Sequence, residues 1–356
     1  LVTNSTNWTN VNELEADPIT NKVWIAGSNS SSGAQTYTVS GGFSAIPTLS
    51  SGTYFDVQVS LDGVVIVYGK SGAGSVQTFV SNDSGANFSN VSGSGATQIP
   101  ASGRTRMEYA ISFDKNSNNM YNIFASATIG DLAGVYISED NGQTWVQIAP
   151  SNQNQSSFAP FTSLNGQGTY DQIVSSVPGN YNQFLLGGID IYKWIREVGI
   201  TPAFGQWYQK TLWFASAFSP VYAHADQHEM EWDQNEILYI GNDGGVGKNI
   251  DHGENIWVPH NRGYNVTQFY SVAFNKYGHT MGGAQDNGTQ YKNFTGVTSL
   301  EYQQVMGGDG FDCDISHINP DVMFATVYNG DYNRSDDEGN GWEFFGPVTS
   351  GPTTSN

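Results

Sequence analysis

The chain has 356 residues and a formal net charge of −20, because 33 acidic residues outnumber 13 basic ones. Such a surface repels the phosphates of nucleic acids and anionic membranes, which argues against nucleic-acid binding. Aromatic and charged residues each make up 13% of the chain, whereas disordered chains are poor in aromatics and rich in charge. No apolar run approaches the about 18 residues of a membrane span, and the single cysteine, Cys313, excludes an intrachain disulfide. We therefore expect a folded protein without membrane insertion.

Seven segments of similar pattern follow one another along the chain. Each begins with alternating polar and apolar residues and continues into a short apolar strand that ends near glycine, a pattern that favours strands over helices. The spacing of these segments, roughly 40 to 65 residues, is that of four-stranded propeller blades. We predict an all-β protein, a seven-bladed β-propeller of four-stranded antiparallel blades. The segments are residues 11–27, 54–69, 107–126, 170–188, 228–245, 269–288 and 311–330.

The repetition also sets the expected domain organisation, because a repeat fold of this length often forms a single domain. We expect one propeller over residues 1–350 and a flexible tail over residues 351–356. The chain begins with Leu1 and without a signal peptide, which is typical of a mature product or a fragment. We therefore expect it to be part of a larger chain or assembly.

A second pattern, S-x-D-x-G-x-T-W, recurs inside these units and is complete in VYISEDNGQTWVQI, residues 135–148. Its aspartate can accept hydrogen bonds from backbone N–H groups of the turn that follows. Its glycine supplies a positive φ, and its tryptophan can pack between neighbouring blades. We interpret the motif as a structural hairpin and not as a binding loop. The copies comprise Ser81, Asp83 and Gly85; Ser138, Asp140, Gly142 and Trp145; Asn249, Asp251 and Gly253; and Ser335, Asp337, Gly339 and Trp342.

This motif resembles the Asp-box, or BNR repeat, of sialidases, tandem-propeller xyloglucanases and sortilin-type receptors. GNDGGV (241–246) and GGAQDNGT (282–289) also resemble segments of xyloglucanase-like BNR proteins. The resemblance implies Asp-box hairpins and a secreted or cell-surface protein, although one propeller fold serves many activities. A sialidase is disfavoured, because the chain lacks that family's Arg-Ile-Pro segment and has five arginines in all. Xyloglucanases place one catalytic acid on each of two propellers, so this chain would supply half of such a site.

Antiparallel blades place the hairpins on one face, and they place the segments that lead into the first strands, together with the second turns, on the opposite face. That opposite face is acidic. If blades five to seven are adjacent, five aspartates converge there and repel one another. A proton, a basic neighbour or a cation must relieve this repulsion, and calcium is the cofactor we consider first. The aspartates are Asp226, Asp243, Asp286, Asp309 and Asp331, and the basic candidates are Arg104 and Arg106.

Three interpretations of the acidic sector stay open. Paired carboxylates could catalyse glycoside hydrolysis, with Asp226 and Asp309 as the candidates. Carboxylates and carbonyl groups could bind calcium. The aspartates could also be ordinary turn residues.

His224, Asp226 and His228 alternate along a predicted strand, so their side chains are expected to share one face. A hydrogen-bonded network that plugs the channel is the favoured reading of this trio, and a transition-metal site is the alternative. Residues 193–214 form an aromatic-rich insertion that suits either sugar stacking or packing between blades. Its aromatic residues include Trp194, Trp207, Tyr208, Trp213 and Phe214.

Two functions follow from this sequence. We expect a non-catalytic module of a secreted or surface-displayed protein that binds a glycan or a protein partner through the acidic face. The alternative is a glycoside hydrolase that acts on a polysaccharide with paired carboxylates. The module is preferred, because no family's full catalytic set matches this sequence residue by residue.

Overall fold

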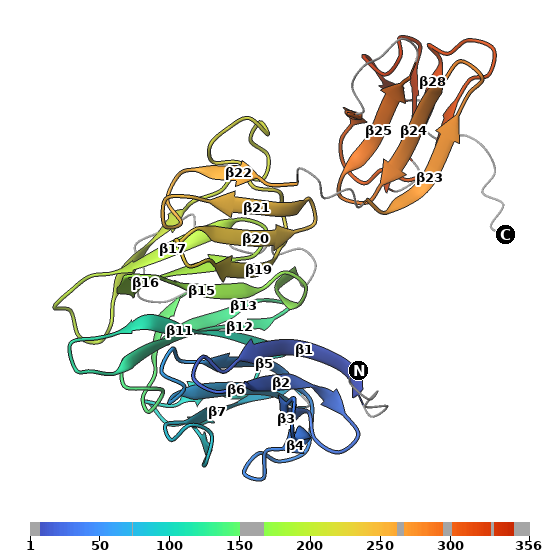
Figure 1. The fold of residues 1–356 in the computed structure, drawn as a ribbon. Coiled ribbons are helices and arrows are strands. Elements are labelled where there is room, and N and C mark those ends of the chain that lie inside the picture. The colour runs from blue at the N-terminus through green and yellow to red at the C-terminus, as the bar shows by residue number, and fades with distance from the viewer. Residues whose placement is uncertain are drawn as a thin grey trace. The chain divides into compact units, whose positions relative to one another are not determined.

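The computed structural model describes residues 8–72, 74–149, 167–261, 267–294, 301–328 and 331–344. They form two compact units, the first ending at His260 and the second beginning at Asn261 (Figure 1). No α-helix occurs among the described residues, and no helix found in them could cross a membrane. Seven four-stranded antiparallel sheets follow one another in chain order, five in the first unit and two in the second.

These sheets confirm the predicted all-β class and the four-stranded antiparallel blades. The closure of seven blades into one ring and the single domain over residues 1–350 stay predictions. The tail predicted at residues 351–356 lies outside the described residues.

Each sheet is a simple meander in which every strand pairs with the next along the chain. The first unit contains β1 (Trp8–Ala16), β2 (Lys22–Asn29), β3 (Ala34–Thr38), β4 (Gly42–Ala45); β5 (Tyr54–Val59), β6 (Ile66–Gly72), β7 (Ser75–Ser81), β8 (Ser89–Asn90); the short pair β9 (Ser92–Gly93) and β10 (Ile99–Pro100); β11 (Arg106–Lys115), β12 (Tyr121–Ile129), β13 (Asp131–Ser138), β14 (Val146–Ala149); the 3-10 turn η1 (Gln167–Thr169); β15 (Ile173–Val177), β16 (Asn180–Gly187), β17 (Ile191–Arg196), β18 (Gly205–Gln209); and β19 (Gln227–Trp232), β20 (Leu238–Asn242), β21 (Gly245–Asn249), β22 (Trp257–Pro259). The second unit contains β23 (Phe269–Phe274), β24 (His279–Ala284), β25 (Gly288–Asn293), β26 (Gln303–Met306); and β27 (Cys313–Ile315), β28 (Met323–Val327), β29 (Asp331–Ser335), β30 (Glu343–Phe344).

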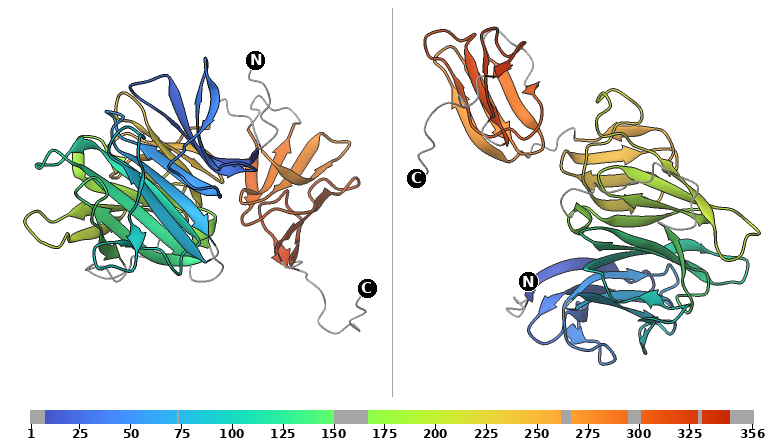
Figure 2. Two further views of the ribbon diagram at one scale, coloured as in Figure 1. Left: turned by 90° about the horizontal axis from the view of Figure 1, so that it is seen from below. Right: turned by 180° about the vertical axis from the view of Figure 1, so that it is seen from behind.

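The first strands of the five sheets in the first unit lie next to one another. β1 contacts β5, β5 contacts β11, β11 contacts β15, and β15 contacts β19 (Figure 2). This succession is the arrangement of propeller blades, whose first strands surround a central space. Loops that lead into these strands therefore lie at the same edge of the sheets as the turns between second and third strands. We call this edge the crossover face.

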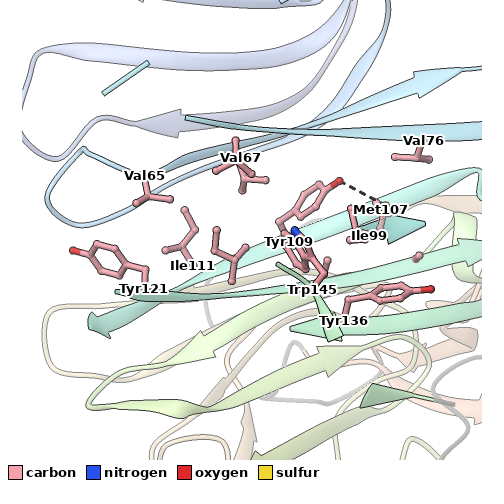
Figure 3. Close-up of a cluster of buried hydrophobic side chains, with 14 residues drawn as sticks. Val65, Val67, Val76, Ile99, Met107, Tyr109, Ile111, Tyr121, Tyr136 and Trp145 are labelled. Atoms are coloured by element: carbon pink, nitrogen blue, oxygen red, sulfur yellow. Dashed lines mark hydrogen bonds between the residues drawn. The ribbon is translucent and has the colours of Figure 1, made fainter. Parts of the chain in front are cut away.

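Neighbouring sheets of the first unit bury their apolar side chains against each other. Val67 of the second sheet and Tyr109 of the third belong to one buried cluster, which also contains Trp145 (Figure 3). Phe124 and Phe184 stack between the third and fourth sheets with ring centroids 4.2 Å apart. The cores thus lie between blades, where large aromatic side chains pack among aliphatic ones.

The second unit has its own core between its two sheets. Met281 and Tyr291 of the sixth sheet pack with Ile315 and Met323 of the seventh. Cys313 belongs to the same cluster and is buried, which fits a small apolar role better than a reactive one.

The S-x-D-x-G hairpins connect the third and fourth strands, at the edge opposite the crossover face. In the hairpin after β13, Ser138 Oγ donates to Asp140 Oδ1 at 2.7 Å and accepts from the Gly142 amide at 2.9 Å. Asp140 Oδ1 also accepts from the Thr144 amide at 2.8 Å. Both bonds recur in the other three copies. The side chain of Ser81, Asn249 or Ser335 donates to Asp83, Asp251 or Asp337, respectively, and accepts from the amide of Gly85, Gly253 or Gly339.

The hairpin after β13 also packs against the neighbouring sheet. Gly142 has a φ of 82°, and a Cβ at this position would lie 2.8 Å from Val80 Cγ2 on the neighbouring sheet. Trp145 is buried and donates its indole N–H to the Gly142 carbonyl at 3.0 Å. The hairpin thus contacts the preceding blade through a glycine and a tryptophan, which explains the spacing of the motif.

Candidate functional site

Three aspartates of the first unit gather on its crossover face. Asp171 follows η1, Asp226 immediately precedes β19, and Asp243 occupies the turn between β20 and β21. The side chain of Gln167 donates hydrogen bonds to Asp226 Oδ1 at 2.9 Å and to Asp171 Oδ2 at 3.3 Å. A carboxylate oxygen of Asp226 and one of Asp243 lie within 4.8 Å of each other. We call Asp171, Asp226 and Asp243 the tri-aspartate site.

An aromatic ring and a histidine border this site. His228 Nε2 lies 2.7 Å from Asp243 Oδ1, and the Tyr170 hydroxyl donates to Asp243 Oδ2 at 2.9 Å. The Tyr170 ring meets the His228 ring edge to face, with centroids 4.8 Å apart. Tyr170 is 51% exposed, so its hydroxyl and its ring are held by Asp243 and His228 while about half of the residue stays accessible to solvent.

The three carboxylates differ in their electrostatics. Burial, followed by repulsion from Asp226, raises the pKa of Asp171 to about 7. Burial and repulsion from Asp243 raise the pKa of Asp226. Burial would also raise the pKa of Asp243, but hydrogen bonds from His228 and Tyr170 outweigh it and lower that pKa. Near neutral pH the site therefore holds an ionised Asp243 beside carboxyls that retain protons more readily.

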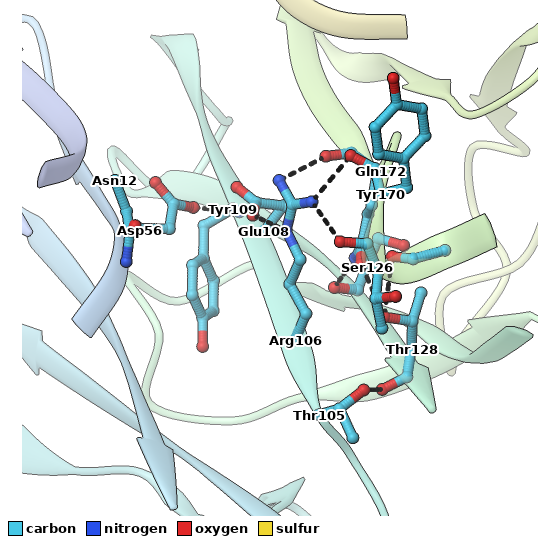
Figure 4. Close-up of polar contacts among 12 residues, drawn as sticks. Asn12, Asp56, Thr105, Arg106, Glu108, Tyr109, Ser126, Thr128, Tyr170 and Gln172 are labelled. Carbon is cyan, nitrogen blue, oxygen red and sulfur yellow. Dashed lines mark hydrogen bonds and ion pairs between the residues drawn. The ribbon is translucent and has the colours of Figure 1, made fainter. Parts of the chain in front are cut away.

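Arg106 positions the segment that carries Tyr170 and Asp171. Its guanidinium group donates to the carbonyl groups of Thr169 and Tyr170 at 3.1 and 3.3 Å and to that of Gln172 at 3.2 Å. The same group pairs with Glu108 at 2.6 Å (Figure 4). Because these bonds reach backbone atoms, Arg106 anchors the loop to β11. Its guanidinium donors are used by this loop and by Glu108.

The predicted strand alternation of His224, Asp226 and His228 is wrong. β19 begins only at Gln227, and Asp226 has a φ of 64°. A left-handed residue at the start of the strand turns the backbone, so the period-two rule does not apply across it. The fold still brings His224 close to the turn that carries Asp243, since a Cβ at the next residue, Gly244, would lie 2.4 Å from His224 Cγ.

The other predicted site residues belong to the second unit or to the segment that precedes β11. Asp286 and Asp309 belong to the second unit, where the Asp286 amide donates to Asp309 Oδ1 at 2.9 Å. Asp331 begins β29 of the same unit, and its carbonyl accepts from the Asn333 side chain at 3.3 Å. Arg104 donates to the Ser102 carbonyl at 2.6 Å and to the Tyr136 hydroxyl at 2.7 Å. The convergence of all five acids on one sector stays a prediction.

The sequence interpretation missed a second acidic group, which lines the central space of the first unit. A cavity of about 140 Å³ lies between the first strands, and β1 and β19 each contribute two glutamates to its wall. Burial, followed by repulsion from Glu229, raises the pKa of Glu13 to about 8. Burial, followed by repulsion from Glu231 and then Glu229, raises the pKa of Glu15 to about 8. The alternation in NELEA and HEMEW was the available signal, because alternate residues of a first strand share a face.

The aromatic insertion divides into two parts. Trp194 and Trp207 are buried between the third and fourth sheets, which supports packing between blades for this pair. Trp213 and Phe214 follow β18 on the crossover loop and are 50% and 68% exposed. The exposed pair therefore belongs to the same face of the sheets as the tri-aspartate site.

Comparisons with known proteins give likenesses of structure only. No protein-family model matches the chain, and no curated protein sequence matches it. The GH74 enzyme of Niastella koreensis is similar over 94% of this chain and 49% of its own, with 13% identity and a TM-score of 0.41. The GH74 xyloglucanase of Xanthomonas campestris is similar over 91% and 53%, with 11% identity and a TM-score of 0.40. YCF48 bound to a D1 peptide is similar over 84% and 82%, with 12% identity and a TM-score of 0.38.

This chain spans about half the length of the two GH74 structures. At these identities and TM-scores the comparisons say nothing about what the chain binds.

Proposed function

We propose that this chain is an Asp-box-type propeller module of a secreted or surface-displayed protein, and that it binds a glycan through the crossover face of its first unit. The observation that carries the proposal is the half-exposed Tyr170 ring, fixed by its hydroxyl to Asp243 and by its edge to His228. An aromatic plane beside fixed hydrogen-bonding groups is the usual composition of a site that orients a polar ligand.

Sugars fit this surface chemically. A pyranose presents an apolar face of C–H groups, which an aromatic ring can cover, and a rim of hydroxyls. The carboxylates of Asp226 and Asp243 accept hydrogen bonds from such hydroxyls. Tyr170 combines a large apolar face with a polar end, so it is suited to a ligand that has both kinds of surface. A neutral glycan fits better than an acidic one, because the chain carries a net charge of −20.

The test measures binding of the purified chain to an array of neutral polysaccharides, followed by calorimetry on the best ligand. Tyr170→Ala should weaken binding at least tenfold. Tyr208→Ala is the matched control, since Tyr208 is 41% exposed and lies on β18. The proposal fails if no neutral glycan binds, or if the two tyrosine variants weaken binding equally.

A glycoside hydrolase is the second candidate, and one observation favours it. Asp226 and Asp243 have carboxylate oxygens within 4.8 Å of each other and pKa values shifted in opposite directions. Retaining glycosidases pair a carboxylic acid of raised pKa with an ionised carboxylate, and their two carboxyl groups lie about 5 Å apart. Release of reducing sugars that Asp226→Asn abolishes while binding persists would establish this activity. Asparagine tolerates the positive φ at this position, so the variant should keep the loop conformation.

A further inference from the structure

We propose that Asn29 and Asn90 are attachment sites for N-linked glycans. The chain contains eleven Asn-x-Ser/Thr triplets, the sequence signal for this modification, and six of them lie wholly within the described residues. The inference rests on the secreted location in the proposed function, because a chain meets the activated glycan only along a secretory pathway. The six triplets begin at Asn29, Asn82, Asn87, Asn90, Asn287 and Asn333.

Two of these triplets share a conformation in which the third residue binds the asparagine side chain. Ser31 donates its hydroxyl to Asn29 Oδ1 at 2.8 Å and its amide to the same atom at 2.9 Å. Ser92 donates to Asn90 Oδ1 in the same way, at 2.6 and 2.9 Å. No described residue accepts a hydrogen bond from the Nδ2 atom of Asn29 or Asn90. A glycan on either nitrogen would therefore disturb no hydrogen bond of the described fold.

The other four asparagines already use their side-chain nitrogen in the fold. Asn87 Nδ2 donates to Asp83 Oδ2 at 2.8 Å, inside the hairpin after β7. Asn82, Asn287 and Asn333 each donate from Nδ2 to a backbone carbonyl, at 3.4, 3.1 and 3.3 Å. Attachment replaces one of the two hydrogens on Nδ2 with a bulky sugar, so it interferes with these bonds. The structure thus separates two free triplets from four that are engaged.

Both sites lie at the surface. Asn29 is half-buried at the end of β2 and is followed by two exposed serines, and Asn90 is exposed at the end of β8. Asn29 belongs to the first sheet and Asn90 to the second, whereas Tyr170 precedes the first strand of the fourth. An attached glycan and the proposed polysaccharide-binding surface would therefore use different blades.

The chemistry of attachment explains why the serine hydroxyl matters. Nδ2 forms a bond to the anomeric carbon of a glycan that is activated as a lipid-linked pyrophosphate. The bond from that carbon to the pyrophosphate oxygen breaks, the lipid pyrophosphate leaves with the electron pair, and an Nδ2 proton passes to a base of the transferring enzyme. An amide nitrogen is a weak nucleophile, because its lone pair is delocalised onto the carbonyl group. A hydroxyl donor at Oδ1, as Ser31 and Ser92 provide, stabilises the negative charge that develops as the proton leaves.

The experiment produces the full chain behind a secretory signal peptide in a eukaryotic cell that carries out N-glycosylation. The attached glycans are released with an enzyme that converts a glycosylated asparagine into aspartate, and peptide mass spectrometry then measures the occupancy of each site. Circular dichroism checks that the secreted chain keeps its β-fold. We expect the occupancy of Asn29 and Asn90 to exceed that of Asn87 and Asn333 by about fivefold or more, because only the latter pair must give up hydrogen bonds.

Two variants test the role of the hydroxyl. Ser31→Ala should abolish the glycan on Asn29 and leave the one on Asn90. Ser30→Ala is the matched control, because Ser30 is the exposed middle residue of the same triplet, and it should keep both glycans. Unmodified Asn29 and Asn90 in the secreted chain would overturn the proposal. So would equal occupancy of the free and the engaged asparagines, or a glycan that persists on Asn29 in Ser31→Ala.

The outcome is separable from that of the proposed function. Enzymatic removal of the attached glycans should leave the binding of neutral polysaccharides unchanged, because Tyr170 belongs to another sheet. Polysaccharide binding by a secreted chain that carries no glycan on either asparagine would remove this inference and leave the proposed function standing. Glycans on Asn29 and Asn90 of a chain that binds no polysaccharide would do the reverse.

Discussion

Replacing Gly142 with alanine would insert a methyl group between the second and third sheets. Gly142 has a φ of 82°, a conformation that costs an L-residue about 1–2 kcal/mol. The new Cβ would lie 2.8 Å from Val80 Cγ2 and 3.2 Å from Ile123 Cδ1. Such overpacking of a dense core costs about 1–3 kcal/mol.

These contributions are partly offset, because alanine restricts the unfolded chain more than glycine does, by about 0.4–1 kcal/mol. The free energy of unfolding should therefore fall by about 1–4.5 kcal/mol, the sum of the strain and overlap costs less this offset. Gly179→Ala isolates the backbone effect, since Gly179 has a φ of 72° and a Cβ there would meet nothing within 4 Å. That control should lose only about 1 kcal/mol.

The assay is urea unfolding of both variants and the wild type, followed by tryptophan fluorescence and by far-ultraviolet circular dichroism. Coincident transitions from the two probes license a single free energy of unfolding. The difference between the two variants then measures the contact of the hairpin with the neighbouring sheet. Equal losses in Gly142→Ala and Gly179→Ala would refute the view that this hairpin packs between blades.

Three further predictions concern stability. Asp140→Ala should lower the free energy of unfolding by about 1–3 kcal/mol, because it leaves turn N–H groups unsatisfied, and it should leave ligand affinity unchanged; weaker binding at full stability would contradict this. Because the pKa of Glu13 is raised from 4.5 to about 8, its proton stabilises the fold at low pH, and stability should fall as pH rises from about 4.5 to about 8. Urea titrations at several pH values should show a shallower fall for Glu13→Gln, and an unchanged slope would refute the assignment. Glu254→Gln should destabilise the chain by about 1–3 kcal/mol, because the ammonium groups of Lys193 and Lys210 would each lose a carboxylate 2.5 Å away; an unaltered melting temperature would show that these two ion pairs contribute nothing.

Local features of the fold could be predicted from the sequence. The S-x-D-x-G hairpin was predictable because the hydrogen bonds among its serine, aspartate and glycine join residues within a few positions of one another, as between Ser138 and Gly142. The strands were predictable for the same reason, since period-two alternation depends only on neighbouring residues. The order of strands in each sheet follows chain order, so no long-range pairing had to be inferred.

The sites required the tertiary structure. Asp171 and Asp226 are far apart in the chain, and only the packing of the fourth and fifth sheets brings their carboxyl groups together. Glu13 and Glu229 come from the first and fifth sheets, and their raised pKa values come from burial that no local pattern encodes. The alternation of His224, Asp226 and His228 that the sequence favoured is likewise interrupted by the left-handed φ of Asp226. Hydrogen bonds within a turn depend only on residues close together in the chain. Desolvation of acids, and repulsion between acids far apart in the chain, arise only once the blades have packed.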